Sequence, residues 1–286
     1  MSIYGNIKNI KSVNKALDAI RKEAERPVSI VIMANPQVEA DIVRNLRANA
    51  DQRLVFGLSE LKLEADREAR LAGADLAIAI VDIDESHDQL EAVVRPAYRA
   101  RSRLIFVTGG AYDQAFANKL QEAFKTTGDD IIFIPAMDRL AIDTVLIPAI
   151  VHKFPKKKLA LAAKLPLFRD RVVDDIIANT AKQNAAIGVA VFVPGADMPL
   201  LTLNQVKMVL RIAAAYGEEL SIQRLNEVLA VVGGGFVLRA VARQILGFIP
   251  VAGWAIKGGI AYGGTLAVGE GAKRYLGSRP AGARKA

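Results

Sequence analysis

The chain has 286 residues, of which 52% are hydrophobic, and it carries a formal net charge of +8 and no cysteine. This length suits about two domains, and the apolar content is enough for a packed core in each. The absence of cysteine excludes disulfide bonds and thiolate metal sites, and it fits a cytoplasmic protein.

The N-terminal residues 1–26 are predicted to hold an amphipathic helix. They are polar and charged, with no apolar core, so we expect no secretory signal peptide. Apolar side chains recur at intervals of three and four within 7–25, which predicts a helix that ends before Pro27. Its apolar face can lie on a membrane surface, bind a partner helix or pack on the next domain, and packing is the commonest of these outcomes.

Residues 27–153 alternate between short runs rich in Val and Ile and longer helical patterns. The predicted strands are 28–34, 53–58, 75–82, 103–108 and 130–135, and the predicted helices are 38–50, 61–72, 87–100, 112–126 and 139–152. Continuous apolar runs are typical of strands buried on both faces of a sheet. The alternation therefore predicts an α/β domain with a doubly wound, mostly parallel five-stranded sheet.

Residues 154–277 are predicted to form a second, all-α domain, followed by a disordered basic tail at 278–286. Thr202 and Gln205 have the spacing of a capping box, which predicts a helix that begins there. Gly217 is the expected stop of that helix.

Three stretches of the second domain carry almost no charge: 185–196, 228–238 and 245–269. The last is about long enough to span a bilayer. Lys257 lies near its centre, however, where a charge is costly. Membrane insertion, peripheral attachment and a water-exposed helical bundle all stay open.

Small residues recur at every fourth position of this last stretch. They are Ala255, Gly259, Gly263, Ala267 and Gly271. Positions four apart lie on one side of a helix, and small side chains there let another helix approach closely. We therefore predict that these five residues pack against a neighbouring helix.

The stretch after the first predicted strand is where a phosphate-binding loop lies in many α/β domains. Residues 34–41, which include Asn35, have the length of such a loop. Glu39 stands in place of its glycine, Ala40 in place of its lysine and Asp41 in place of its hydroxyl residue. Two carboxylates would repel a triphosphate, so we predict a degenerate loop, no hydrolysis, no catalytic residues and no cofactor.

Other strand ends also carry polar residues. Asp82 and Asp84 are weak candidates for Mg²⁺ ligands, although capping of the next helix is the commoner role of such carboxylates. The segment 108–110 reads as a plain loop or an anion-binding nest. His87 and His152 have no evident metal or catalytic partners, so we expect both at the surface.

Basic residues flank the weakly charged region on both sides. They lie in 153–158 and in the tail, at Lys273, Arg274, Arg279, Arg284 and Lys285. Such placement favours an anionic membrane surface, although a solvated surface explains it as well.

Several segments from residue 165 onward resemble the YcjF-related family, a domain of unknown function (number 697). The similar segments are LPLFR (165–169), IIANTA (176–181), NA (184–185), KMV (207–209), IAAAYG (212–217), GFIPVAG (247–253) and TLAVG (265–269). Their order and spacing are also similar to that family. Members often follow a small-GTPase domain, and many are described as membrane-associated.

The resemblance implies that residues 27–153 are a GTPase-like domain, and IPAMD (134–138) is similar to the loop that ends a GTPase core. The chain departs from that pattern in the phosphate loop, at 56–58 where the Mg²⁺-binding aspartate is missing, and at 108–111 in place of the guanine-reading motif. One strand is also absent. A receiver-like fold, with Asp82 and Thr108 at strand ends, is the second choice because its acidic pair and late lysine are missing.

Together these features predict a non-enzymatic, membrane-associated adaptor in the cytoplasm, at the inner face of the cell membrane, with a pseudo-GTPase head. Its expected partners are an anionic membrane surface and either a true GTPase or a second copy, and not nucleic acid. The alternatives are a soluble oligomerising or GTPase-regulating module and, ranked lower, a nucleotide-binding protein with a divergent site.

Overall fold

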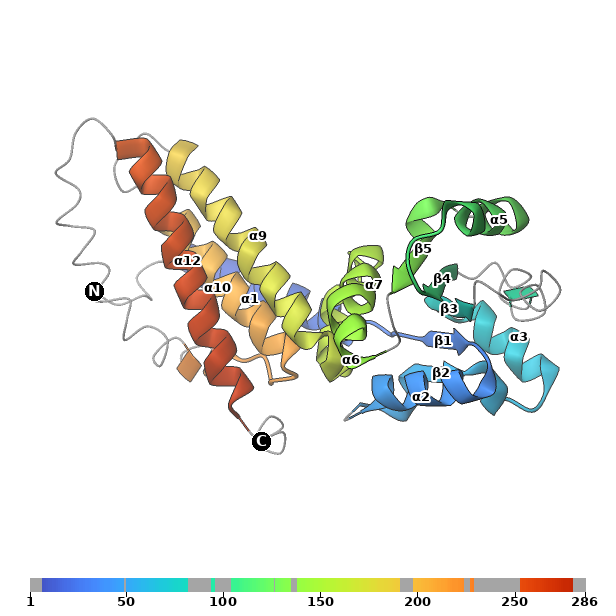
Figure 1. The fold of residues 1–286 in the computed structure, drawn as a ribbon. Helices are drawn as coiled ribbons and strands as arrows, with labels where there is room; N and C mark the ends of the chain where they lie inside the picture. The colour runs from blue at the N-terminus through green and yellow to red at the C-terminus, as the bar shows by residue number, and fades with distance from the viewer. Residues whose placement is uncertain are drawn as a thin grey trace. The chain divides into compact units, whose positions relative to one another are not determined.

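The structure is a computed structural model that describes residues 7–48, 50–81, 94–95, 104–125, 127–134, 138–190, 198–223, 227–228 and 253–279. It separates into two compact units (Figure 1). The α/β unit comprises residues 27–155 and 164–168, and the helical unit comprises the described parts of 1–26, 156–163 and 169–286.

The α/β unit is built on a five-stranded sheet with the order β2-β1-β3-β4-β5. Its strands are β1 (Ile30–Met33), β2 (Val55–Gly57), β3 (Leu76–Val81), β4 (Leu104–Gly109) and β5 (Ile131–Ile134). Every neighbouring pair is parallel. The predicted α/β class is confirmed, and the sheet is wholly parallel. This strand order is also that of flavodoxin-like folds, in which the direction of strand addition switches between β1 and β3.

Helices and turns connect the strands of this unit. They are α2 (Pro36–Arg47), η1 (Gln52–Leu54), η2 (Leu58–Glu60), α3 (Glu64–Ala72), α5 (Gln114–Phe124), η3 (Gly128–Asp130), α6 (Arg139–Ala141), η4 (Ile142–Leu146), α7 (Ile147–Lys153) and η5 (Pro166–Phe168). The segment predicted as one helix at 139–152 contains a π-helical turn, η4, just before Pro148. Proline lacks the N–H that the regular helical ladder needs, which accounts for the irregular turn.

The sheet is buried on both faces because successive side chains of a strand point in opposite directions. On one face, Val31 and Phe106 belong to a cluster with Leu120 of α5. On the other face, Ile30 and Ile32 have no exposed surface. Burial of both faces explains the continuous apolar runs from which the strands were predicted.

The helical unit contains α1 (Ile7–Glu25), α8 (Lys158–Lys164), α9 (Arg169–Ala190), α10 (Met198–Ala215) and α12 (Gly253–Gly277). Figure 1 shows α9, α10 and α12 side by side, and each of the three contacts the other two. The predicted all-α region is thereby confirmed. Among the described helices, none combines the length and the hydropathy that a membrane crossing requires.

The N-terminal helix α1 packs against α10 within the helical unit. Leu17 and Ile20 are buried on its apolar face. At its C-terminal end, the Arg21 side chain donates to the Leu220 carbonyl at 2.8 Å. The predicted amphipathic helix is confirmed, and its apolar face is occupied by this chain's own helices.

The two ends of α10 give different outcomes for the sequence predictions. The helix begins at Met198, so Thr202 lies inside it and the predicted capping box is wrong. The predicted stop is confirmed: Gly217 has a φ of +73°, and the N–H of Glu218 donates to the Ala213 carbonyl at 3.0 Å. Glycine adopts this left-handed conformation readily, as helix ends of this type require.

Candidate functional site

The connection between β1 and α2 consists of Ala34 and Asn35 alone. The Asn35 side chain caps α2 by accepting a hydrogen bond from the Gln37 N–H at 3.1 Å. Pro36 follows in the first helical turn, where its missing N–H costs little. The stretch expected to have the length of a phosphate loop is mostly helix, so that expectation is wrong: no long loop is left to wrap around a phosphate.

Glu39 is turned into the protein, with 2% of its surface exposed. Its Oε1 accepts hydrogen bonds from the Ser59 N–H at 2.9 Å and from the Ser59 hydroxyl. A Cβ added to Gly57 would overlap this same oxygen, so the lack of a side chain at Gly57 makes room for it. Glu39 therefore ties α2 to the turn after β2. We expected it to face a bound phosphate and repel it, and its inward orientation corrects that expectation.

The other two residues of the expected loop lie on the outer surface of α2. Ala40 is exposed. Asp41 pairs with Arg44, with an oxygen–nitrogen distance of 3.1 Å. Asn35, Glu39, Ala40 and Asp41 thus do not converge on a common point, because the helix that holds three of them directs their side chains to different sides.

The carboxyl end of β4 is more open. Thr108 is fully buried, and a Cβ added to Gly109 or Gly110 would meet no described atom within 4 Å. Gly110 has a φ of +92°, which suits glycine. Asp113 then caps α5 by accepting from the Phe116 N–H at 2.9 Å. This part of the edge is a turn that leads into a capped helix.

The weak metal candidates Asp82 and Asp84, together with His87, lie outside the described residues. His152 is exposed on α7, as expected. Across the part of the chain that the structure describes, no three His, Cys, Asp or Glu side chains gather closely enough to hold a metal ion.

Some residues of each basic cluster form ion pairs within their own unit. Lys153 Nζ lies 2.7 Å from Asp130 Oδ1. Burial works to raise the pKa of the Asp130 carboxyl, but the hydrogen bonds from Lys153 and Thr127 and the lysine's charge outweigh it, so this pKa lies below its usual value. Among the C-terminal basic residues, Lys273 of α12 has its Nζ 2.5 Å from Asp174 Oδ1. These ion pairs leave less charge for a membrane surface than the sequence indicates.

The packing face of α12 differs from the predicted ladder. Its buried residues are Gly258, Ala261, Thr265, Val268, Gly269, Ala272 and Leu276. Gly259 and Gly263 are exposed, with no described atom near an added Cβ, whereas Ala267 and Gly271 are half-buried. The side chain of Ala255 lies outside the description. Because an α-helix has 3.6 residues per turn, two residues that are four apart differ by about 40° in direction around the helix axis. Residues spaced by four therefore shift progressively away from the packed face.

Two other glycines make the close approach that the ladder was expected to make. A Cβ on Gly258 would lie 2.7 Å from the Val189 Cγ2, and one on Gly269 would lie 2.7 Å from the Ile177 Cγ1. Both contacts are with α9, the helix that α12 packs against most extensively. Glycine-mediated helix packing is therefore present, at positions other than those predicted.

A polar network that the sequence reasoning missed joins these helices. Thr265 of α12 accepts hydrogen bonds from the Asn184 Nδ2 of α9 at 2.9 Å and from the Gln205 Nε2 of α10 at 3.2 Å. The Thr265 hydroxyl donates to the Ala261 carbonyl at 2.7 Å, and Asn204 donates to Asn184 Oδ1 at 3.0 Å. The available signal was Thr265, a single polar residue in an uncharged helical stretch, whereas Asn184, Asn204 and Gln205 lie beside other polar residues in the sequence.

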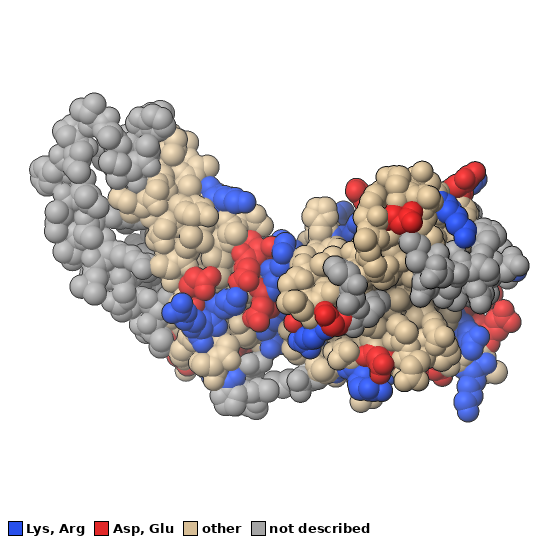
Figure 2. All heavy atoms as spheres, in the orientation of Figure 1, with Lys and Arg blue, Asp and Glu red and all other residues tan. Residues whose placement is uncertain are grey.

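The surface of the helical unit is divided by charge. Figure 2 shows charged side chains gathered around the start of α9 and the end of α12, and a mostly uncharged surface at the other end of these helices. Residues 183–190, 198–206 and 258–269 contain no charged residue at all. Three apolar side chains are exposed in these segments: Val189 at 37%, Leu200 at 50% and Tyr262 at 36%. We call these three the uncharged patch.

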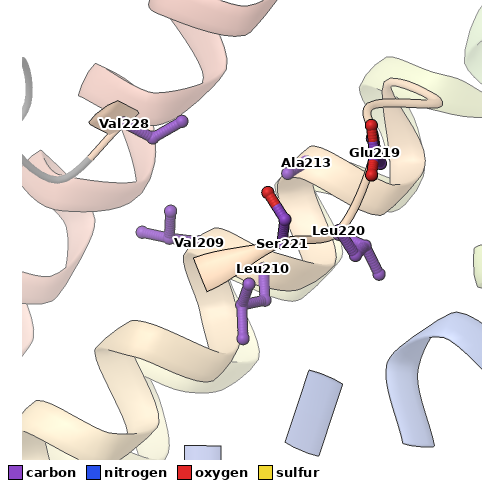
Figure 3. Close-up of a pocket in the computed structure, with 7 residues that line it drawn as sticks. All are labelled: Val209, Leu210, Ala213, Glu219, Leu220, Ser221 and Val228. Carbon is purple, nitrogen blue, oxygen red and sulfur yellow. The ribbon is translucent and has the colours of Figure 1, made fainter. Parts of the chain in front are cut away.

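Some hollows are lined by described residues. One, shown in Figure 3, is lined by Val209, Leu210, Ala213, Glu219, Leu220, Ser221 and Val228. It measures about 10 Å³, which is room for about one water molecule. Another, of about 470 Å³, is an open hollow beside α3, lined by Ser29, Leu61, Asp66, Ala69, Arg70 and Gly73. The first is too small for a metabolite, and the second is open, with Ser29, Asp66 and Arg70 as its polar lining residues.

Comparison of the sequence with profiles of known protein families gives no match, and comparison with curated proteins gives none either. The resemblance to the YcjF-related family thus rests on the segments that carry it.

Proposed function

We propose that this chain is a non-enzymatic adaptor that acts at a membrane surface, with the α/β unit as a pseudo-GTPase head that lacks a phosphate loop. The observation that carries the proposal is the inward orientation of Glu39. In a phosphate loop, free backbone N–H groups and a lysine surround the phosphates. Here Asn35 caps the first turn of α2, and Glu39 joins that helix to Ser59.

Calorimetric titration of the full chain with GTP at millimolar magnesium tests the head. We expect no saturable heat, because nothing in the turn at Ala34–Asn35 replaces the missing loop and lysine. The matched comparison is the same titration with Glu39→Ala. Micromolar affinity in the native chain would show that the site binds nucleotide after all, and affinity that appears only in Glu39→Ala would show that this carboxylate is what closes the site.

For the membrane contact we propose peripheral attachment through the helical unit. The uncharged patch presents three apolar side chains within segments that carry no charge, and Tyr262 has the amphipathic ring that favours a membrane interface. Peripheral helices bury such a face about 5–10 Å into the headgroup region. The same face can alternatively pack against a second copy, which is the main competing function.

Sedimentation with vesicles of phosphatidylcholine and phosphatidylglycerol tests this part of the proposal. We expect the full chain to pellet with the vesicles, to be released by carbonate, and to lose binding in Leu200→Glu. The control is Leu140→Glu in the α/β unit, where Leu140 is 70% exposed. Either of two results would favour the oligomerising module. In the first, the chain never pellets with the vesicles; in the second, Leu200→Glu converts a dimer to a monomer in the absence of vesicles.

A further inference from the structure

The strand β2 lies at one edge of the sheet and has three residues. Among the described strands it pairs with β1 alone, in the register Ile30↔Val55, Val31↔Phe56 and Ile32↔Gly57. In a strand, the backbone groups of residues i and i+2 point to the same side. The groups of Val55 and Gly57 therefore share one side, and an edge strand presents such groups to any extended segment that reaches it.

Two side chains occupy that outer side of β2. The Arg47 Nε donates to the Val55 carbonyl at 2.8 Å. The Glu60 Oε2 accepts from the Gly57 N–H at 3.3 Å. One donor and one acceptor are thus supplied to the strand from outside, where a neighbouring strand would supply an N–H and a C=O.

The same two side chains are bonded to each other. Arg47 Nη1 and Nη2 donate to the two carboxylate oxygens of Glu60 at 2.8 and 2.7 Å. This two-point pairing holds both groups in a planar, preorganised arrangement. The Arg47 guanidinium also lies 5.9 Å from the centre of the Phe56 ring. We call Arg47 and Glu60 the edge clip.

The groups held by the edge clip are those with which the strand can pair with itself. In an antiparallel pair, two opposite residues exchange both N–H···O=C bonds. If two copies meet about a two-fold axis through Phe56, Val55 of one copy lies opposite Gly57 of the other. The Val55 carbonyl would then receive the Gly57 N–H of the other copy, and these are the groups now bonded to the clip. Such a contact is closed and self-complementary.

We infer that the edge clip keeps the β2 edge from pairing with the same strand of a second copy of this chain. Natural sheets protect their edges with charged side chains and short edge strands. Here the strand is short, and both charges are bonded directly to its backbone. This role of the edge clip does not depend on the proposed adaptor function, because it concerns a contact that the α/β unit avoids and not one that it makes.

Light scattering of the full chain over a concentration series tests the inference. In Arg47→Ala we expect a species of about twice the native mass that grows with concentration, as a two-fold contact requires. The control is Arg44→Ala, which removes a 76% exposed arginine and its ion pair from the same helix without touching β2. We expect Arg44→Ala to keep the native mass. A folded Arg47→Ala protein with the native mass throughout the series would overturn the inference.

A second variant and a second measurement guard against loss of folding. Glu60→Ala uncovers the Gly57 N–H and leaves the Arg47–Val55 bond in place. The double variant Arg47→Ala/Glu60→Ala frees both the Val55 carbonyl and the Gly57 N–H. In this double variant, we expect hydrogen exchange at the Gly57 N–H to be fast in dilute protein and several-fold slower in concentrated protein. Concentration-independent exchange at Gly57 in the double variant would contradict pairing with a second copy, because unfolding alone does not depend on concentration in this way.

Discussion

The two units each bury polar side chains, but they use them differently. In the α/β unit, Glu39 of α2 holds one turn, at Ser59, next to a sheet whose strands are already aligned by backbone hydrogen bonds. In the helical unit, Asn184, Gln205 and Thr265 connect three helices. Helices satisfy their backbone groups internally, so only side chains can set the register between them. Buried polar groups thus support a local turn in one unit and the packing of whole helices in the other.

The largest expected effect is at a packed glycine of the helical unit. Gly269→Val should destabilise the protein by about 3 kcal/mol, because the added carbons would overlap Ile177 of α9. Denaturant unfolding measures the change. The control is Gly263→Ala on the exposed side of α12, which should stabilise by about 0.5–1 kcal/mol because glycine is a poor helix former. Equal effects of the two variants would contradict the assignment of the packed face.

The polar network should give the next largest effect. Thr265→Val keeps the shape of the side chain but removes the acceptor for Asn184 and Gln205, at a cost of about 2 kcal/mol. The matched control is Thr180→Val on α9, since the Thr180 hydroxyl only donates to the Ile176 carbonyl of its own helix. Thermal unfolding separates the two, and a Thr265→Val protein as stable as Thr180→Val would show that the network does not hold the helices together.

A smaller loss is expected in the α/β unit. Glu39→Ala removes two hydrogen bonds to Ser59, and we expect a cost of about 1 kcal/mol because water can reach the exposed Ser59. Asp41→Ala on the outer side of the same helix should change stability by less than about 0.5 kcal/mol. Chemical denaturation of both variants gives the comparison, and a larger loss for Asp41→Ala would reverse the roles assigned to the two carboxylates.

The smallest effect should depend on pH. The pKa of Asp130 is lowered in the folded protein, so its pairing with Lys153 stabilises the fold above the ordinary aspartate pKa and is lost as the pH falls through the lowered value. Asp130→Asn should cost at most about 1 kcal/mol at pH 7, because the pair is partly screened by solvent. The difference from the native chain should shrink as the pH falls below the ordinary aspartate pKa and disappear below the lowered pKa of Asp130, which unfolding experiments at several pH values can follow. A difference that persists in acid would exclude this ion pair as its source.

Errors in the sequence predictions share a cause. The stretch after β1 was assigned to a loop by analogy with other α/β domains, but Asn35 and Pro36 are strong helix-start residues and the helix begins there. The capping box at Thr202 and Gln205 has the right spacing, yet α10 begins one turn earlier, at Met198, with Pro199 in its first turn. In each case a length or a spacing matched while the three-dimensional context differed.

The sequence alone predicts several features of the fold. They are the order of neighbouring elements along the chain, the α/β and helical classes, the amphipathic first helix and the end of α10 at Gly217. They follow from local preferences and from the period of apolar residues, which each segment carries by itself. Other features depend on residues far apart in the chain. They are the strand order, the inward orientation of Glu39, the edge clip, the packed face of α12 and the network around Thr265. Only tertiary structure decides them, because a side chain's role there is set by which distant group it meets, and no local pattern records that partner.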